Sequence, residues 1–162
     1  MIDASVKVSG SIGVRSAGVV KEDLESSLEY MLAVVGPSPE AVTILYHLSA
    51  YPGVDVGERI TFAQRAIDML ETVEEGRSML WGRAMFHLGR VTAYKAATAL
   101  EFARSDRMMV DGIEAMKQHN IDGTGLVDVT TSLCNLADMR IAHNVVGGAF
   151  LSMGAAYREH VE

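Results

Sequence analysis

Residues 78–103 read SMLWGRAMFHLGRVTAYKAATALEFA, and the predicted fold depends on this stretch. It contains no proline and consists mostly of residues that favour the α-helix. We therefore predict one helix over the whole stretch, ending near Arg104. At about 100° of turn per residue, the side chains of this helix fall on three stripes that run along its length.

The three stripes differ in chemistry, and the rest of the chain is expected to cover the first two. The first is rich in small residues and holds Gly82, Phe86, Gly89, Ala93, Ala96, Leu100 and Ala103. The second is bulkier and mostly apolar, with Trp81, Met85, Leu88, Thr92, Ala99 and Phe102. The third is polar, with Arg83, His87, Arg90, Tyr94 and Glu101.

Composition indicates a single globular domain. The chain has 162 residues, of which 49% are hydrophobic and 22% charged, as expected for a domain with one sizeable core. The net charge of −7 disfavours a regulator that binds nucleic acid, since such proteins present a basic surface.

The sequence also predicts a soluble cytoplasmic protein. Cys134 is the single cysteine, so no disulfide can form within the chain, as is usual in a reducing compartment. The first ten residues lack the basic and then apolar pattern of a secretory signal. The longest uncharged stretch, 144–157, is too short to cross a bilayer as a helix, and we expect no membrane partner.

Residues 1–20 are predicted to form an extended or β-hairpin arm that is rich in glycine. Apolar residues alternate with polar or small ones on both sides of Ser9-Gly10-Ser11, which is typical of a short hairpin. A lone hairpin is marginal in water. The arm therefore packs on its own helices, pairs with another subunit or stays mobile.

The remaining residues, 21–162, are predicted to form a mostly α-helical bundle of five or six helices. Acidic residues open the first helix and Gly36-Pro37 ends it, whereas Ser38 and Pro39 begin the second. Asp55 and Glu58 have the spacing of a capping box, and Gly76 predicts a kink or short break. Besides 78–103, the predicted helices are 21–35, 40–51, 57–75, 107–119 and 126–160.

Small residues recur every seven positions in two of these helices. In the helix 78–103 they are Gly82, Gly89, Ala96 and Ala103. In the last helix they form two series, Ala142, Ala149 and Ala156, and Gly147 and Gly154. Two such helices can pack closer than the usual 8–10 Å. We predict that they pair, within one chain or between two, although ordinary alanine-rich composition would give a similar pattern.

The polar stripe is the first candidate site. Arg83, His87 and Arg90 are spaced by four and three residues and share one helix face, which Tyr94 extends. Two guanidinium groups beside an imidazole can bind a phosphate or carboxylate, and His87 would then transfer protons. The alternative is a solvated face that makes salt bridges to acidic neighbours.

A second candidate lies on the last helix. Arg140 and His143 are three residues apart and share a face. If the two small-residue stripes pack together, these side chains approach the face of Arg83 and His87 and form a composite site. In that site, His87 and His143 are the catalytic candidates, and the ligand-binding candidates are Arg83, Arg90, Tyr94 and Arg140.

No motif names a reaction, a cofactor or a metal. The five histidines form no HxxxH or HxxH pair, so no metal site is predicted, and Cys134 lies in the apolar segment SLCNLA, which indicates a buried core residue. The leading hypothesis is a binding or assembly protein that works as a homo-oligomer or partner-binding module. The alternative is a small enzyme or ligand carrier that acts on an anionic metabolite.

Overall fold

The chain is mostly α-helical, as the sequence predicts. The computed structural model describes residues 17–73, 76–120, 123, 125–145, 153 and 155–157. These residues contain no strand. Their long helices are α1 (Ala17–Val34), α2 (Pro39–Ala50), α3 (Val56–Val73), α4 (Met79–Ala93), α5 (Ala99–His119) and α6 (Leu126–Ala142).

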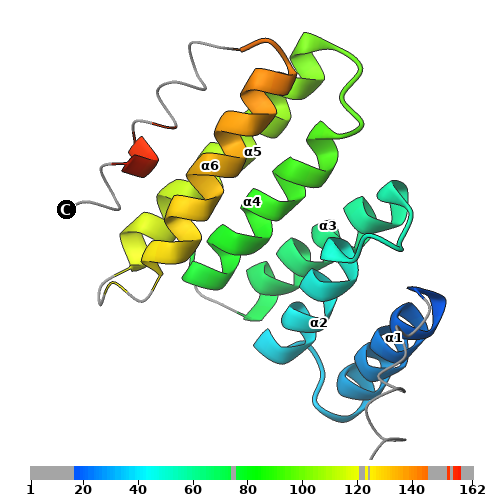
Figure 1. Cartoon of the computed structure of the whole chain (residues 1–162). Helices are drawn as coiled ribbons and strands as arrows, with labels where there is room; N and C mark the ends of the chain where they lie inside the picture. Colours follow the sequence, from blue (N-terminus) through cyan, green and yellow to red (C-terminus); the bar gives the residue numbers. More distant parts are fainter. Residues whose placement is uncertain are drawn as a thin grey trace, which may run out of the picture.

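Each helix packs mainly on its neighbour in the sequence. Helix α1 lies at one end of the molecule, and α4, α5 and α6 lie side by side at the other (Figure 1). The most extensive contact joins α4 to α5, and α6 packs on both of them. This arrangement makes α4 the helix that connects the two halves of the bundle.

The first helix begins earlier than predicted. Residues 17–20 belong to α1, so the predicted arm cannot extend to residue 20; residues 1–16 lie outside the described residues. The physical reason is packing, because Val20 and Leu24 stand one turn apart and line the same hollow as Ala50 and Tyr51 of the α2 terminus.

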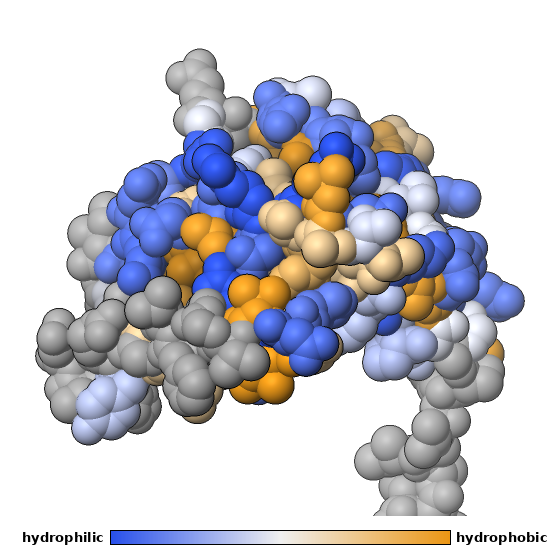
Figure 2. Space-filling view, turned by 90° about the horizontal axis from the view of Figure 1, so that it is seen from above, coloured by the Kyte–Doolittle hydropathy of each residue, from blue (hydrophilic) through white to orange (hydrophobic). Residues whose placement is uncertain are grey.

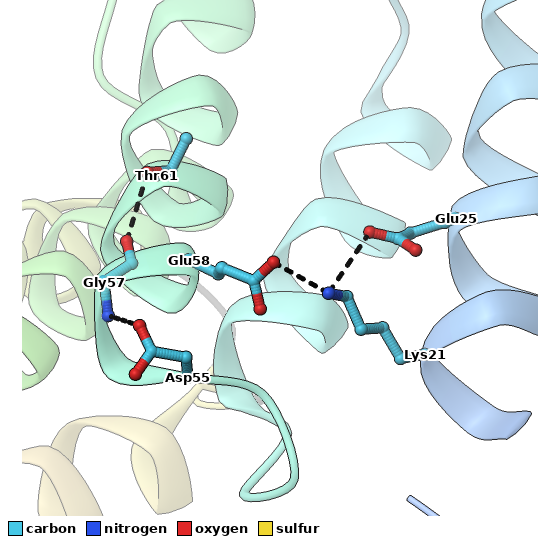
Figure 3. Close-up of polar contacts among 6 residues, drawn as sticks. All are labelled: Lys21, Glu25, Asp55, Gly57, Glu58 and Thr61. Carbon is cyan, nitrogen blue, oxygen red and sulfur yellow. Dashed lines mark hydrogen bonds and ion pairs between the residues drawn. The ribbon is translucent and has the colours of Figure 1, made fainter. Parts of the chain in front are cut away.

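Polar contacts fix the starts of α2 and α3. Ser38 accepts a hydrogen bond from the Ala41 N–H at 3.3 Å, with Pro39 in the first turn, as the sequence predicts. At α3, Asp55 Oδ1 accepts from the Gly57 N–H at 2.7 Å (Figure 3). This backbone bond is the main reason that the pKa of Asp55 lies below its usual value.

Glu58, the other residue of the predicted capping box, joins α3 to α1. Its carboxylate accepts a hydrogen bond from Lys21 Nζ at 2.8 Å, and Glu25 lies 3.8 Å from the same nitrogen (Figure 3). The bond to Glu58 is the main cause that raises the pKa of Lys21. The ion pair lies at the surface, where such pairs add little to stability.

The predicted helix 78–103 is in fact two helices, and this prediction was wrong. Helix α4 ends at Ala93 and α5 begins at Ala99, so the predicted separate helix 107–119 is the second part of α5. A capping box causes the break: Thr98 Oγ1 accepts from the Glu101 N–H at 3.2 Å, and Glu101 Oε2 accepts from the Thr98 N–H at 3.0 Å. These bonds start a new helix where propensity alone favours continuing the old one.

The break predicted between the third and fourth helices is confirmed. Gly76 has a φ of +100°, a conformation that glycine adopts without steric cost. Two residues later, Ser78 accepts a hydrogen bond from the Trp81 N–H at 3.1 Å and so caps α4.

Glycines bring α4 and α5 into backbone contact. A Cβ atom on Gly82 would lie 2.8 Å from the Gly112 carbonyl oxygen, and one on Gly89 would lie 2.7 Å from that of Ser105. From the other side, a Cβ on Gly112 would lie 2.5 Å from the Phe86 nitrogen. The small-residue stripe therefore makes a close approach, and its partner within the described residues is α5. The predicted pairing with the last helix is not found among these residues.

The last predicted helix, 126–160, is also interrupted. Helix α6 ends at Ala142, and Asn144 has a φ of +60°, a conformation that asparagine adopts more readily than most residues. Of the last helix's small residues, Gly147, Ala149 and Gly154 lie outside the described residues. Cys134 is exposed on α6, contrary to the prediction of a core residue.

The core consists of two apolar clusters that share α4 as a wall. The first lies among α1–α4 and includes Leu45, Leu48 and Leu70. The second lies among α4, α5 and α6 and includes Met109, Met116 and Leu136. Seen from above, hydrophilic side chains predominate on the surface and apolar residues form small groups between them (Figure 2). In the described part of the chain, no helix has the length and apolar character needed to cross a membrane.

The α4–α5 contact makes Gly112→Ala a sensitive test. Alanine favours a helix over glycine by about 1 kcal/mol, but its methyl group would meet the backbone of Phe86 and Gly82. We expect overpacking to lower the free energy of unfolding by about 1–3 kcal/mol, measured by urea denaturation.

The matched control is Gly18→Ala in α1. No described atom lies within 4 Å of its Cβ position, so this change should leave stability equal or slightly higher. Equal stability of the two variants would contradict the close packing of α4 on α5.

Candidate functional site

A polar pocket of about 180 Å³ lies where α4 and α6 face each other, with α2 and α5 at its sides. It is lined by Tyr46, Arg83, Phe86, His87, Arg90, Met116, Asp128, Thr131, Ser132 and Asn135. Four of these residues come from α4 and four from α6. The pocket contains three side chains of the polar stripe on which the sequence analysis based its first candidate site.

The glycine contact fixes where these α4 side chains lie. Arg83 follows Gly82 and Arg90 follows Gly89, and both glycines are held against the α5 backbone. The seven-residue spacing corresponds to two turns of helix, so both arginines reach the same side of α4. His87 lies between them on that face.

His87 is a buried histidine with a defined hydrogen-bonding role. Its side chain is 2% exposed, and its Nδ1 lies 3.3 Å from Arg90 Nη2. A guanidinium group has only donors, so Nδ1 accepts and the ring proton of neutral His87 lies on Nε2. The Tyr46 ring packs beside the imidazole at a centroid distance of 5.1 Å.

The protein environment keeps His87 neutral. Burial lowers its pKa from 6.5 to about 4; the Ser49 backbone partly opposes this effect, whereas the positive charges of Arg90 and Arg59 add to it. A base with this pKa is almost entirely unprotonated at pH 7 but binds a proton weakly. The arrangement therefore suits an acceptor that orients Arg90, and the catalytic role of His87 stays a prediction.

One donor of Arg90 is enclosed by the protein. Its Nε is buried and has no hydrogen-bond partner among the described residues. Buried donors without acceptors cost free energy. Arg90 lines the pocket, and its two Nη nitrogens carry the other four N–H donors of the guanidinium group.

Arg83 is paired across the pocket. Its guanidinium donates to Asp128 of α6, and both side chains are partly exposed, at 44% and 41%. With His87 neutral, the two arginines and Asp128 give the pocket a formal charge of +1. This local charge is opposite in sign to the net charge of the whole chain.

The α6 wall supplies neutral hydrogen-bonding groups. Thr131, Ser132 and Asn135 line the pocket together with Asp128. These residues follow the spacing i, i+3, i+4 and i+7, which places them on one helix face. The sequence analysis missed this polar stripe, although its periodicity could have revealed it.

The structure does not bring Arg140 and His143 into this pocket. Arg140 donates two hydrogen bonds to Asp106 of α5, at 2.6 and 2.8 Å. His143 stacks on Phe102 at 3.9 Å, and its Nδ1 donates to the Met139 carbonyl at 2.9 Å. Arg140 therefore joins α6 to α5, and His143 contacts both α5 and the last turn of α6. Neither residue lines the first candidate site.

Tyr94 is also separated from the pocket. It follows the last residue of α4, and 59% of its side chain is exposed. His143 instead lines a larger cavity of about 450 Å³ between the start of α5 and the end of α6. The composite site expected from the sequence is not formed among the described residues.

Comparison with known proteins gives no lead on function. No family model, curated protein or solved structure matches this chain. Within the described ranges, no group of three or more His, Cys, Asp and Glu side chains is placed to hold a metal ion. The function must therefore be argued from the geometry of the pocket.

The low pKa of His87 predicts how stability depends on pH. A histidine whose pKa is lower in the folded state takes up a proton on unfolding, so stability falls as the pH drops below 6.5 and levels off below about 4. Between pH 7 and pH 4.5, His87 should remove about 2–3 kcal/mol from the free energy of unfolding. Urea denaturation at both pH values measures this loss.

His87→Gln keeps an acceptor for Arg90 but cannot titrate, so this variant should lose about 2–3 kcal/mol less than the wild type over the same interval. His119→Gln, at the exposed end of α5, is the control and should behave as the wild type. Identical pH dependence in all three proteins would show that His87 titrates normally.

Proposed function

We propose that the protein is a binding protein for a small anionic molecule, which it holds in the pocket between α4 and α6. The observation that supports this most directly is that two guanidinium groups, of Arg83 and Arg90, line one small pocket that contains a single carboxylate, that of Asp128. A site rich in donors and of positive charge favours a ligand with negatively charged oxygens. Such a site suits a ligand carrier or sensor.

Binding is favoured over catalysis by the state of His87. The imidazole is neutral, its Nδ1 is engaged by Arg90, and its pKa of about 4 lies well below neutral pH. General acid–base catalysis works best when the pKa is close to the working pH. In this proposal His87 positions Arg90, and Arg90 with Arg83 holds the anion.

The test is ligand-induced stabilisation measured by thermal unfolding. Lactate and inorganic phosphate are the probes, each titrated until the melting temperature stops rising steeply. A ligand at ten times its Kd adds about 1.4 kcal/mol, which raises the melting temperature by roughly 3–5 °C for a chain of this size. Arg90→Gln should abolish this rise while the variant remains folded by circular dichroism.

Arg107→Gln serves as the control, because Arg107 is 81% exposed on α5 and does not line the pocket. It removes the same charge and should keep the full stabilisation. The proposal is wrong if neither anion stabilises the wild type, or if both arginine variants lose the effect equally.

A second candidate function is self-assembly through α1, in line with the homo-oligomer that the sequence predicts. Tyr30 and Val34 lie one turn apart near the end of α1, and Val35 follows. Their exposed fractions are 69%, 64% and 62%. Because α1 stands at one end of the bundle (Figure 1), we propose that this apolar group contacts a second copy of the chain.

Native mass spectrometry tests the self-assembly proposal. The wild type should appear as a dimer or larger oligomer, and Tyr30→Lys combined with Val34→Lys should shift it to the monomer. Leu100→Lys, at an exposed apolar residue of α5, is the control and should leave the oligomer intact. A monomeric wild type would rule out assembly through this surface.

A further inference from the structure

We infer that the ligand of the pocket is a small monocarboxylate that carries a hydroxyl or oxo group, rather than a phosphate ester, a nucleotide or a dicarboxylate. This inference rests on the anion-binding function proposed above. It adds the size, the charge and the polarity of the ligand. Each of these properties follows from a different feature of the pocket.

The volume of the pocket limits the size of the ligand. The pocket has a volume of about 180 Å³, below the range of roughly 300–1,000 Å³ that is usual for ligand pockets. A small molecule suits this space, for example a hydroxy or oxo acid of three carbons. Nucleotides and sugar phosphates are several times larger and would not be enclosed.

The charged side chains of the pocket determine the charge of the ligand that fits it. Asp128 lies in the pocket and already neutralises Arg83, so Arg90 is the guanidinium that remains for the ligand. One carboxylate matches one guanidinium, and the two planar groups can form parallel hydrogen bonds. A second negative charge on the ligand would face the Asp128 carboxylate and be repelled.

The walls set the polarity of the rest of the ligand. Phe86 and Met116 form an apolar side, and the hydroxyl and amide groups of Thr131, Ser132 and Asn135 form a polar side on α6. A short carbon chain fits the first side, and a hydroxyl or oxo substituent can bond to the second. A plain fatty acid would leave the α6 groups without a partner inside the pocket.

Isothermal titration calorimetry on the full chain tests the inference with four probes: lactate, propionate, malonate and inorganic phosphate. Propionate lacks the hydroxyl of lactate, and malonate adds a second carboxylate at similar size. We expect lactate to bind at least about fivefold more tightly than propionate and malonate, since one neutral hydrogen bond or one charge repulsion is of that order.

Asp128→Asn tests the charge argument separately. In the wild type, the Asp128 carboxylate repels both carboxylates of malonate but only the single carboxylate of lactate. The substitution removes this repulsion, so the preference for lactate over malonate should shrink roughly fivefold. Asp138→Asn removes the same charge from an exposed position of α6 and should leave the preference unchanged. The Arg83–Asp128 pair lies at the surface, where losing it costs little stability, so both variants should fold.

The outcomes separate this inference from the proposed function. If none of the four probes binds, the anion-binding function is wrong and the ligand class falls with it. If malonate, phosphate or propionate binds the wild type as tightly as lactate, the anion site stands but the assigned ligand class is wrong. If Asp128→Asn leaves the ratio of lactate to malonate unchanged, Asp128 does not set the charge of the ligand.

Discussion

Backbone contact between α4 and α5 is the constraint on which the rest of the structure depends. It exists because Gly82, Gly89 and Gly112 present no Cβ where the two helices meet, and a methyl group at any of them would lie within 3 Å of the other backbone. The contact fixes the rotation of α4. It therefore decides which α4 side chains enter the core clusters and which face α6.

The pocket follows from that rotation. With the glycines against α5, the arginines that follow them lie toward α6, and His87 is buried between them beside α2. Burying an imidazole costs free energy, and the protein lowers this cost by keeping the ring neutral and using it as the acceptor for Arg90. Two positive side chains line a small cavity beside this buried ring, and this combination supports the proposal that a ligand binds there.

The sequence predicts local features, such as helix caps, better than it predicts which helices pack together. Ser38 and Gly76 were identifiable because caps and left-handed glycines act over a few residues. The division of 78–103 was not predicted, because the strong helix propensity of the stretch conceals a break that depends on the Thr98–Glu101 capping box. The packing of the glycine stripe on α5 was not predicted, since α5 and the last helix both contain small residues and only long-range packing selects between them. The spacing of Arg83, His87 and Arg90 by four and three residues predicted that they share one helix face. Asp128, on the opposite wall of the pocket, was not predicted as a site residue.

Nitrogen-15 NMR of the His87 ring is the measurement that tests the account most directly. It reports both the protonation state and the tautomer, and it needs no ligand. We predict a neutral ring with its proton on Nε2 from pH 7 down to pH 5, because burial disfavours the cation and Arg90 donates to Nδ1. A proton on Nδ1, or a ring that is charged at pH 6, would mean that His87 does not hold Arg90 in place, and the site would lose its physical basis.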